Sequence, residues 1–311
     1  MPGSTRVKAF LLKRETTYGT DATPAAATNA ILLRNTKISP INAEMVSREI
    51  DSAAMGHMED IAVGTEMVVE GEVEFAGSGT AGTAPAWGTL LRICGFAEVE
   101  TIGTDVAYNP ISDNFESATG YYFYAGKKHL LLGARGDCGF TLNAKGIPII
   151  KYKIMGLYGG ITDEGLPAGL DLTPWQKPLA VNKANTPIAT LFGATLGFYD
   201  FELQRANSLV HRNLPGLEDF VITDRAPTGS ITVPDPSLAT IDFFTKLKNA
   251  DLGTLNIVHG TVAGKKVGIS SAYTQITSVD YDEKDKACAL KLGLKFSHSS
   301  VGNDDFIIKS L

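Results

Sequence analysis

The sequence predicts a mainly β protein in which a unit of strands around one helix occurs twice. In the first copy a strand-like run, Met67–Phe75, leads into a helix-like run, Pro85–Cys94. In the second copy Pro227–Val233 leads into Ser237–Lys248, and each copy then closes with two alternating strands joined by a turn. Because the copies share the order and length of their elements more than residue identity, the pattern indicates an internal duplication of one fold.

Length and composition are consistent with two soluble, globular units. The chain has 311 residues, 44% of them hydrophobic and 20% charged, which suits two domains of ordinary composition. It contains no run of about 18 apolar residues, so we expect no transmembrane helix and no membrane partner. A net charge of −6 argues against nucleic-acid affinity, which requires clustered Lys and Arg. The predicted organisation is an N-terminal arm (1–30), a first domain (31–165), a linker (166–186) and a second domain (187–311).

The first half shows its clearest strand and helix signals between residues 67 and 95. Alternation places Val69, Val73 and Phe75 on one face of a strand and an acidic triplet on the other. The helix 85–95 starts with a proline in its first turn and ends near a glycine that suits a left-handed cap. Residues 51–66 have neither period, and a loop of this length inside a compact domain is usually functional.

Further short strands complete both halves. In the first half we expect strands at 30–34, 39–50, 120–124, 129–132, 137–142 and 147–155, with a hairpin turn at 143–146. In the second half we expect them at 189–192, 196–203, 210–213, 218–222, 254–259, 266–269, 272–281 and 287–296. Residues 1–30 carry a Thr- and Ala-rich stretch that buries little, and this composition predicts an arm that orders against a partner.

The motifs that could carry chemistry are weak. Gly77–Gly82 matches GxGxxG, but the preceding strand is acidic at alternate positions and the helix begins only at Pro85, so a nucleotide site is disfavoured. The five histidines lack metal-ligand spacing, and the three cysteines form no CxxC motif. Cys94 and Cys288 lie in apolar patterns that predict buried thiols. We therefore expect no catalytic residues, no cofactor and no metal.

Four segments of the chain carry a family resemblance. The most specific is the run from Phe75 to Phe96, and the others are Arg14–Pro24, Lys177–Pro187 and Phe220–Gly229. These segments resemble the major tail (tail tube) proteins of long, non-contractile bacteriophage tails. The resemblance implies a β-sandwich or half-barrel with one flanking helix, here duplicated in tandem. It also implies a structural virion protein that self-assembles into stacked rings, forming the conduit for genome ejection. Six such units normally make a ring, so a doubled chain would form a trimer with pseudo-sixfold symmetry.

The resemblance also gives expectations for surfaces and partners. Glu70, Glu72 and Glu74 are candidates for the lumen, because a conduit for DNA should not attract phosphate. Candidates for contacts between rings are Met55, His57, Met58, Ile61 and Tyr18, from the long loop and the N-terminal arm. The implied partners are further copies of the chain and the tape measure, tail-tip and tail-terminator proteins. Double-stranded DNA would pass without specific binding, and assembly would take place in the host cytoplasm.

Two other classes of function remain open from the sequence. One is a tube or tail-tip component of a related injection or secretion machine, although such tubes are usually built from undoubled domains. The other is an enzyme or a carbohydrate-binding β-sandwich module, which would be a monomer with an aromatic-lined cleft. The densest aromatic cluster, Tyr121–Tyr124, is divided by strand alternation between two faces, which favours a role in core and interface packing.

Overall fold

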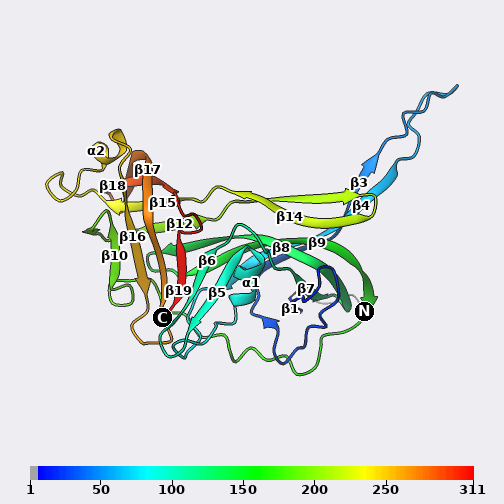
Figure 1. Ribbon diagram of the computed structural model, residues 1–311, viewed down its shortest axis with the longest axis horizontal. Coiled ribbons are helices and arrows are strands. Elements are labelled where there is room, and N and C mark those ends of the chain that lie inside the picture. The colour runs from blue at the N-terminus through cyan, green and yellow to red at the C-terminus, as the bar shows by residue number, and fades with distance from the viewer. Residues whose placement is uncertain (1–5) are drawn as a thin grey trace.

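The computed structural model describes residues 6–311 and shows a mainly β molecule with two short helices (Figure 1). The first half contains β1 (Lys8–Arg14), β2 (Ala30–Ile31), β3 (Arg34–Val46), β4 (Ile61–Glu74), α1 (Gly88–Ile93), β5 (Phe96–Thr101), β6 (Asp105–Pro110), β7 (Ala118–Tyr124), β8 (Lys127–Asn143) and β9 (Ile149–Asp163). The mainly β class predicted from the sequence is therefore confirmed.

The second half follows an irregular connection over residues 164–187. It contains β10 (Ile188–Leu191), β11 (Ala194–Thr195), β12 (Asp200–Gln204), β13 (Asn207–Leu214), β14 (Leu217–Arg225), β15 (Thr228–Pro234), α2 (Phe243–Lys248), β16 (Leu252–His259), β17 (Val267–Lys284), β18 (Ala287–Phe296) and β19 (Ile307–Ser310). Strands β13 and β14 form a separate two-stranded hairpin, and all the other strands belong to one hydrogen-bonded network.

The two halves repeat the same strand pairings in the same order. In the first half, β1 pairs with β2 and β7, β4 with β3 and β9, and β8 with β7 and β9. In the second half, β10 pairs with β11 and β16, β15 with β12 and β18, and β17 with β16 and β18. The helix follows β4 in one half and β15 in the other. These six pairings are thus present twice in one chain.

A continuous antiparallel sheet runs through both halves, and we call it the main sheet. Its order is β3-β4-β9-β8-β12-β15-β18-β17. The joint between the halves is the pairing of β12 with the C-terminal part of β8, from Gln204 opposite Gly139 to Asp200 opposite Asn143. A second joint pairs β19 with β6. The halves are therefore fused by hydrogen-bonded strands as well as by the connecting chain.

One hydrophobic core extends across both joints. In the first half the Phe75 ring lies 5.5 Å from that of Trp87 and 5.4 Å from that of Phe140. In the second half the Phe306 ring lies 5.7 Å from Phe96 of the first half. The buried cluster contains residues from β4, α1, β8, β12, β15 and β17. Because this apolar surface is removed from water only when the halves are together, burial favours their association.

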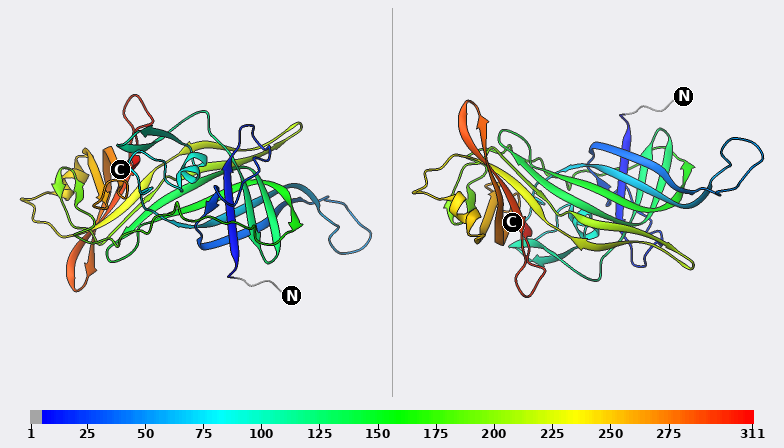
Figure 2. Two further views of the ribbon diagram at one scale, coloured as in Figure 1. Left: turned by 90° about the horizontal axis from the view of Figure 1, so that it is seen from below. Right: turned by 90° about the horizontal axis from the view of Figure 1, so that it is seen from above.

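The views from above and below show an elongated body with two projections (Figure 2). The end of the β3–β4 hairpin extends beyond the body at one end of the molecule. The β17–β18 hairpin, in orange, projects sideways from the body near the other end (Figure 2). We call residues 40–66, which comprise the outer parts of β3 and β4 and the loop 47–60, the arm. Its side chains are almost all exposed.

The structure corrects the expectation of an N-terminal arm over residues 1–30. Residues 1–5 lie outside the described part, but Lys8–Arg14 forms β1, which pairs along its whole length with β7. Phe10 and Leu12 are fully buried in the core. Four consecutive apolar residues, Ala9–Leu12, are buried on both faces of this strand, which the polar stretch that follows them does not indicate.

Other boundaries also differ from expectation. Residues 61–66 were predicted to be loop and are the start of β4. Strands β5, β6 and β19 were not anticipated, and the helices are six residues long, shorter than predicted. The expectation that Cys288 is buried was wrong, since its side chain is exposed at the start of β18, whereas Cys94 and Cys138 are buried. The sequence pattern could not show that this end of β18 extends beyond the core.

Candidate assembly surfaces

The acidic triplet lies on a charged face of the main sheet. Glu70 and Glu72 point away from the core and face lysines of β9 across the strand pair. The Glu70 carboxylate lies 3.2 Å from the Lys153 ammonium group, and that of Glu72 lies 3.1 Å from the Arg34 guanidinium group. Opposite charges on adjacent strands attract modestly at an exposed surface. The triplet is therefore part of a mixed-charge face rather than a bare acidic one.

The same face continues without interruption into the second half. Glu202 of β12 lies 2.9 Å from the Lys151 ammonium group of β9, so this ion pair spans the joint. Beyond it, the alternation of β17 and β18 brings Lys291 and Asp280 to the same face, opposite one another. The second half thus provides its charges from β12, β17 and β18, while the equivalent strand β15 offers serine and threonine.

Both ends of the main sheet have an edge without a strand partner among residues 6–311. β3 pairs with β4 alone. Residues 276–284 of β17 pair with β18 on one edge, and β16 leaves the other edge after Gln275. An open strand edge presents unpaired backbone N–H and C=O groups, which form a ready template for another chain. Each chain thus carries two edges that can be extended.

Four of the predicted contact residues lie on or beside the tip of the arm. Met55, Met58 and His57 lie in loop 47–60 and Ile61 begins β4; all four are exposed, with Met55 99% accessible. Methionine and isoleucine side chains held in water this far from a core are characteristic of contact surfaces. The structure therefore places these four residues in one exposed segment, 55–61.

Tyr18 lies away from the arm tip and is used inside the chain. Its hydroxyl oxygen accepts a hydrogen bond of 2.7 Å from the backbone N–H of Phe220. The Arg135 guanidinium group lies 5.0 Å from the centre of its ring. Burial raises the pKa of its hydroxyl. Tyr18 thus fixes the N-terminal segment against β14, and its contact with another ring remains a prediction.

The β13–β14 hairpin lies against the base of the arm. The Asn213 side-chain amide donates a hydrogen bond of 2.6 Å to the carbonyl oxygen of Val63. The imidazole of His211 stacks on the Phe220 ring, with the centroids 4.5 Å apart. In the duplicated plan, this hairpin occupies the place between β12 and β15 that the arm occupies between β3 and β4. Sequence reasoning did not identify the two hairpins as equivalent.

A polar cluster holds the joint between the halves beneath this hairpin. The Asn207 amide donates to the carbonyl oxygens of Cys94 and Gly136, at 2.8 and 2.9 Å. The fully buried Arg205 donates through Nη2 to Gly95 at 2.6 Å and through Nε to Asn207 at 2.8 Å. Burial lowers the pKa of this guanidinium to about 10. The cluster ties the end of α1 to the start of the second half.

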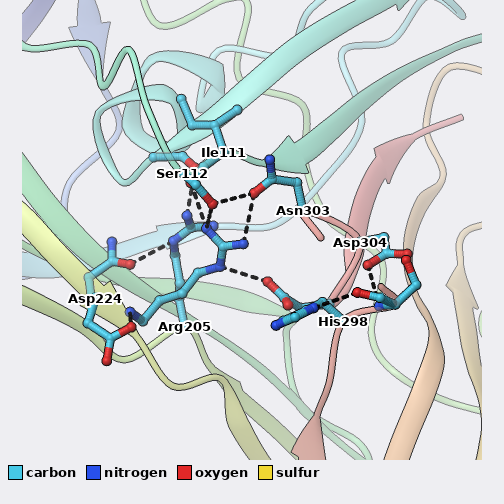
Figure 3. Close-up of polar contacts among 12 residues, drawn as sticks. Ile111, Ser112, Arg205, Asp224, His298, Asn303 and Asp304 are labelled. Atoms are coloured by element: carbon cyan, nitrogen blue, oxygen red, sulfur yellow. Dashed lines mark hydrogen bonds and ion pairs between the residues drawn. The ribbon is translucent and has the colours of Figure 1, made fainter. Parts of the chain in front are cut away.

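A second polar cluster includes Ile111, Ser112 and Asn303 (Figure 3), and its central residue is Arg225 at the end of β14. Its guanidinium group donates to the carboxylate of Asp305 at 2.7 Å and to the carbonyl oxygen of Ile111 at 2.6 Å. It also donates to the Asn303 side-chain oxygen at 3.0 Å, which in turn accepts from the Ser112 hydroxyl at 2.6 Å. One arginine therefore links the first half, the β13–β14 hairpin and the segment before β19.

A comparison with protein families identifies the family of this chain. Residues 5–293 match the model of the family described as phage tail tube protein. The match covers nearly the whole chain, both halves included. The chain belongs to the phage tail tube protein family. This tail tube protein is therefore a structural component of the virion tail, and the resemblance seen in its sequence is confirmed. The comparison with curated proteins finds no match.

The glycine motif of the tail tube protein serves packing between its halves. Gly77 and Gly79 approach the turn that contains Gly264, where the Gly79 N–H donates a hydrogen bond of 2.7 Å to the Gly264 carbonyl oxygen. A Cβ on Gly77 would lie 2.3 Å from that same oxygen. The glycines are thus required by close approach of two backbones. Spacing alone could not distinguish this role from phosphate binding.

The remaining chemical features of the tail tube protein are few. Within residues 6–311, no group of three His, Cys, Asp or Glu side chains is arranged to hold a metal ion. Over the same residues, neither helix has the length and apolar character needed to cross a membrane. The features that the structure does assemble are the charged face, the two strand edges and the arm.

Proposed function

We propose that this protein assembles into trimeric rings with pseudo-sixfold symmetry, and that the rings stack into the tube of a long, non-contractile phage tail. The observation that carries the proposal is the main sheet, whose eight strands contain two equivalent four-stranded units joined edge to edge within one chain. We assign one tail-tube domain to 31–165, together with β1, and the other to 187–311, with 166–186 as the linker.

Ring closure follows from the two open edges of the main sheet. Because the edges of β3 and β17 are different surfaces, their contact is head to tail, and such contacts make rings when the rotation closes. Six tail-tube units in a ring correspond to three doubled chains. A closed barrel would also remove the open edges that an isolated subunit exposes.

The charged face of the main sheet is the proposed lining of the lumen, with Glu70, Glu72 and Glu74 facing the passing genome. Their carboxylates repel phosphate, while the ion pairs of Lys153 with Glu70 and of Lys151 with Glu202 limit the local field. A lining of balanced charge neither binds the DNA backbone nor requires ordered counterions. Genome ejection through such a conduit would proceed without specific contacts to DNA.

Contacts between stacked rings are assigned to the arm. Its exposed tip carries Met55, His57, Met58 and Ile61, and it extends beyond the body of the subunit (Figure 2). Replacing residues 49–59 by a short Gly–Ser turn should leave the subunit folded and soluble but prevent tubes, because this loop lies outside the core. Circular dichroism would measure folding, and electron microscopy would measure tube formation. Loss of folding, or tubes of normal length, would contradict the assignment.

The proposed partners of the assembled tube are those that the resemblance to tail tube proteins implies. The open end rings would meet the tape measure, tail-tip and tail-terminator proteins, and assembly would take place in the host cytoplasm before the tail joins the virion. The tail-tip and tail-terminator proteins would use the same surfaces as ring stacking, because an end ring exposes what a middle ring covers.

Electron microscopy of the purified protein at rising concentration, with tail-tip complexes added as seeds, tests the proposal. Class averages along the tube axis should show hollow rings with threefold symmetry and six lobes. A particle that remains monomeric at all concentrations, with and without seeds, would contradict the proposed assembly. Rings with true sixfold symmetry of whole chains would contradict the trimer.

A further inference from the structure

We propose that residues 37–39 of β3 pair with residues 280–282 of β17 in a second copy of this chain, in the register that β12 and β8 adopt within one chain. Ile38 then faces Tyr281, and Lys37 faces Asp282. The inference deepens the proposed function by naming the contact between subunits of a ring, and it rests on that function. The joint at β12 and β8 is its template.

The equivalence between the halves fixes which residues correspond. Val73 and Val233 are both fully buried and each is the second-last residue of its strand. Following the cross-strand pairs from Val73 leads through Ile150 to Phe140. Following them from Val233 leads through Leu290 to Tyr281. Phe140 and Tyr281 therefore occupy the same place in their units, and both are aromatic.

The opposite edges of the two units correspond in the same way. Four residues before Val73, Val69 pairs with Ile38 of β3. Four residues before Val233, Gly229 pairs with Leu203 of β12. Ile38 and Leu203 are therefore equivalent. Inside the chain Leu203 lies opposite Phe140, and repetition of that joint between copies places Ile38 opposite Tyr281.

The exposure of the equivalent side chains differs between the joint inside the chain and the two open edges. Phe140 and Leu203, which face each other within the chain, are each 0% exposed. Tyr281 is 71% exposed, although it holds the position of Phe140. Ile38 is only partly buried. Pairing β3 of a second copy onto β17 would cover both side chains, as the internal joint covers their equivalents.

Charge is complementary along the same register. The pair Glu202 and Thr141 of the internal joint corresponds to Lys37 and Asp282. Lys37 forms no ion pair among the described residues of its own chain. Asp282 lies 3.4 Å from the Lys284 ammonium group of its own chain and directly precedes Glu283. A β17–β17 contact would oppose the acidic residues Asp280 and Asp282 of two copies, so the Lys37 ammonium group favours β3 as the partner of β17.

The proposed pairing between β3 and β17 is short, because only a short part of β3 is regular. The register of β3 shifts between Arg34 and Lys37 and again between Ser39 and Asn42, with Pro40 in the second shift. Bulges and proline limit pairing on edge strands. Lys37–Ser39 is therefore the regular part of β3 that a second copy can extend, and the template gives it three partners, Asp280, Tyr281 and Asp282.

Disulfide trapping in assembled tubes tests the register. The variant Lys37→Cys with Asp282→Cys, made with Cys288→Ser to remove the exposed native thiol, should give covalent dimers and trimers on oxidation. The control Lys37→Cys with Lys284→Cys uses the same face of β17 but a register two residues away, and should cross-link at least about tenfold less, because a disulfide requires Cβ atoms about 4 Å apart. Lys37 and Asp282 lie at opposite ends of one chain's sheet, so cross-links report on neighbouring copies.

Charge exchange provides an independent measurement. Lys37→Glu and Asp282→Lys should each reduce the yield of tubes by about tenfold, because like charges then oppose each other, and the double exchange should restore it. If tubes form normally but cross-link only in the shifted control, or do not cross-link at all, the proposed pairing of β3 with β17 is wrong while the proposed function still holds. Wild-type protein that forms no tubes would overturn both.

Discussion

At the scale of single residues, the joint between the halves is held by a few buried polar side chains. Asn207 makes three side-chain hydrogen bonds, two of them to carbonyl groups of the first half. Arg205 is fully buried beside it and lies 4.1 Å from the centre of the Phe96 ring. Because buried polar groups are costly when unpaired, each member of the cluster depends on the others.

We expect Asn207→Ala to lower the free energy of unfolding by about 2–4 kcal/mol, since it leaves two carbonyl oxygens and Arg205 Nε without partners. Asn42→Ala is a suitable control, because Asn42 is exposed and makes one long hydrogen bond of 3.3 Å. Urea unfolding of both variants would measure the difference. Equal stability of the two variants would show that the cluster does not hold the joint.

A glutamate held by two arginines in the first half makes the stability of the fold depend on pH. Glu116 accepts hydrogen bonds from Arg92 at 2.6 and 2.7 Å and from Arg14 at 2.8 Å. Burial by itself would raise its pKa, but the two arginines outweigh burial and lower the pKa of Glu116 below its usual value. A lowered folded-state pKa stabilises the fold above the usual glutamate range, and this contribution is lost as the pH falls through the folded-state pKa.

Glu116→Gln should therefore be less stable than the wild type at pH 7, and the difference should shrink as the pH is lowered below about 4. Protonated glutamic acid and glutamine resemble each other in charge, which is why the two proteins converge. Urea unfolding at a series of pH values would measure the difference in stability between the variant and the wild type. A difference that stays constant down to the acid limit would mean that Glu116 does not act through its charge.

At the scale of elements, the fold depends on close approach between segments far apart in sequence. The glycine loop at 77–82 and the turn at Gly264 come from different halves, and their backbones hydrogen-bond directly. A Cβ on Gly264 would lie 2.7 Å from the Thr80 nitrogen, closer than side chains tolerate. This contact secures the loop before α1 against the turn before β17.

Comparison of Gly264→Ala with Gly216→Ala separates this contact from backbone strain. Both glycines have left-handed φ, +81° and +85°, but a Cβ on Gly216 has nothing within 4 Å. Gly216→Ala should cost about 1 kcal/mol of stability from φ alone. Gly264→Ala should cost at least about 2 kcal/mol more, since two backbones must separate. Thermal unfolding of both would decide, and equal losses would show that the loops do not pack as described.

At the scale of the whole molecule, two equivalent units behave as one body. The main sheet crosses from one unit to the other at β8 and β12, and β19 of the second unit pairs with β6 of the first. The buried core includes side chains from both. The connecting segment is therefore not what holds the units together, and the subunit should present one rigid set of edges to its neighbours.

Cleavage of the segment that connects the two halves tests whether they form one body. A protease site inserted at Gly165, which is exposed and has open space around it, should allow cleavage into two fragments. The fragments should remain associated in gel filtration without denaturant, because two strand pairings and the common core connect them. The uncleaved inserted protein is the control. Fragments that separate in native buffer would show that the units are independent domains.

The sequence determined the class of fold, the repeat and the family. Alternation in Met67–Phe75, the cap at Gly95 and the order of elements in each half are local signals, and local signals survive without knowledge of the partner strand. The sequence also contains the motif at Gly77–Gly82 and the segment from Arg14 to Pro24, but it does not show what they do. In the motif, a glycine that a neighbouring backbone requires cannot be distinguished by sequence from a glycine that a ligand requires.

The tertiary structure alone decided the pairing of the strands and the surfaces left open. Phe140 and Tyr281 are equivalent aromatic residues on alternating strands, yet one is buried and the other exposed. The difference lies in what pairs with the neighbouring edge, β12 in one case and no strand of residues 6–311 in the other. Burial depends on contacts between residues far apart in sequence, and periodicity along one strand contains no information about them.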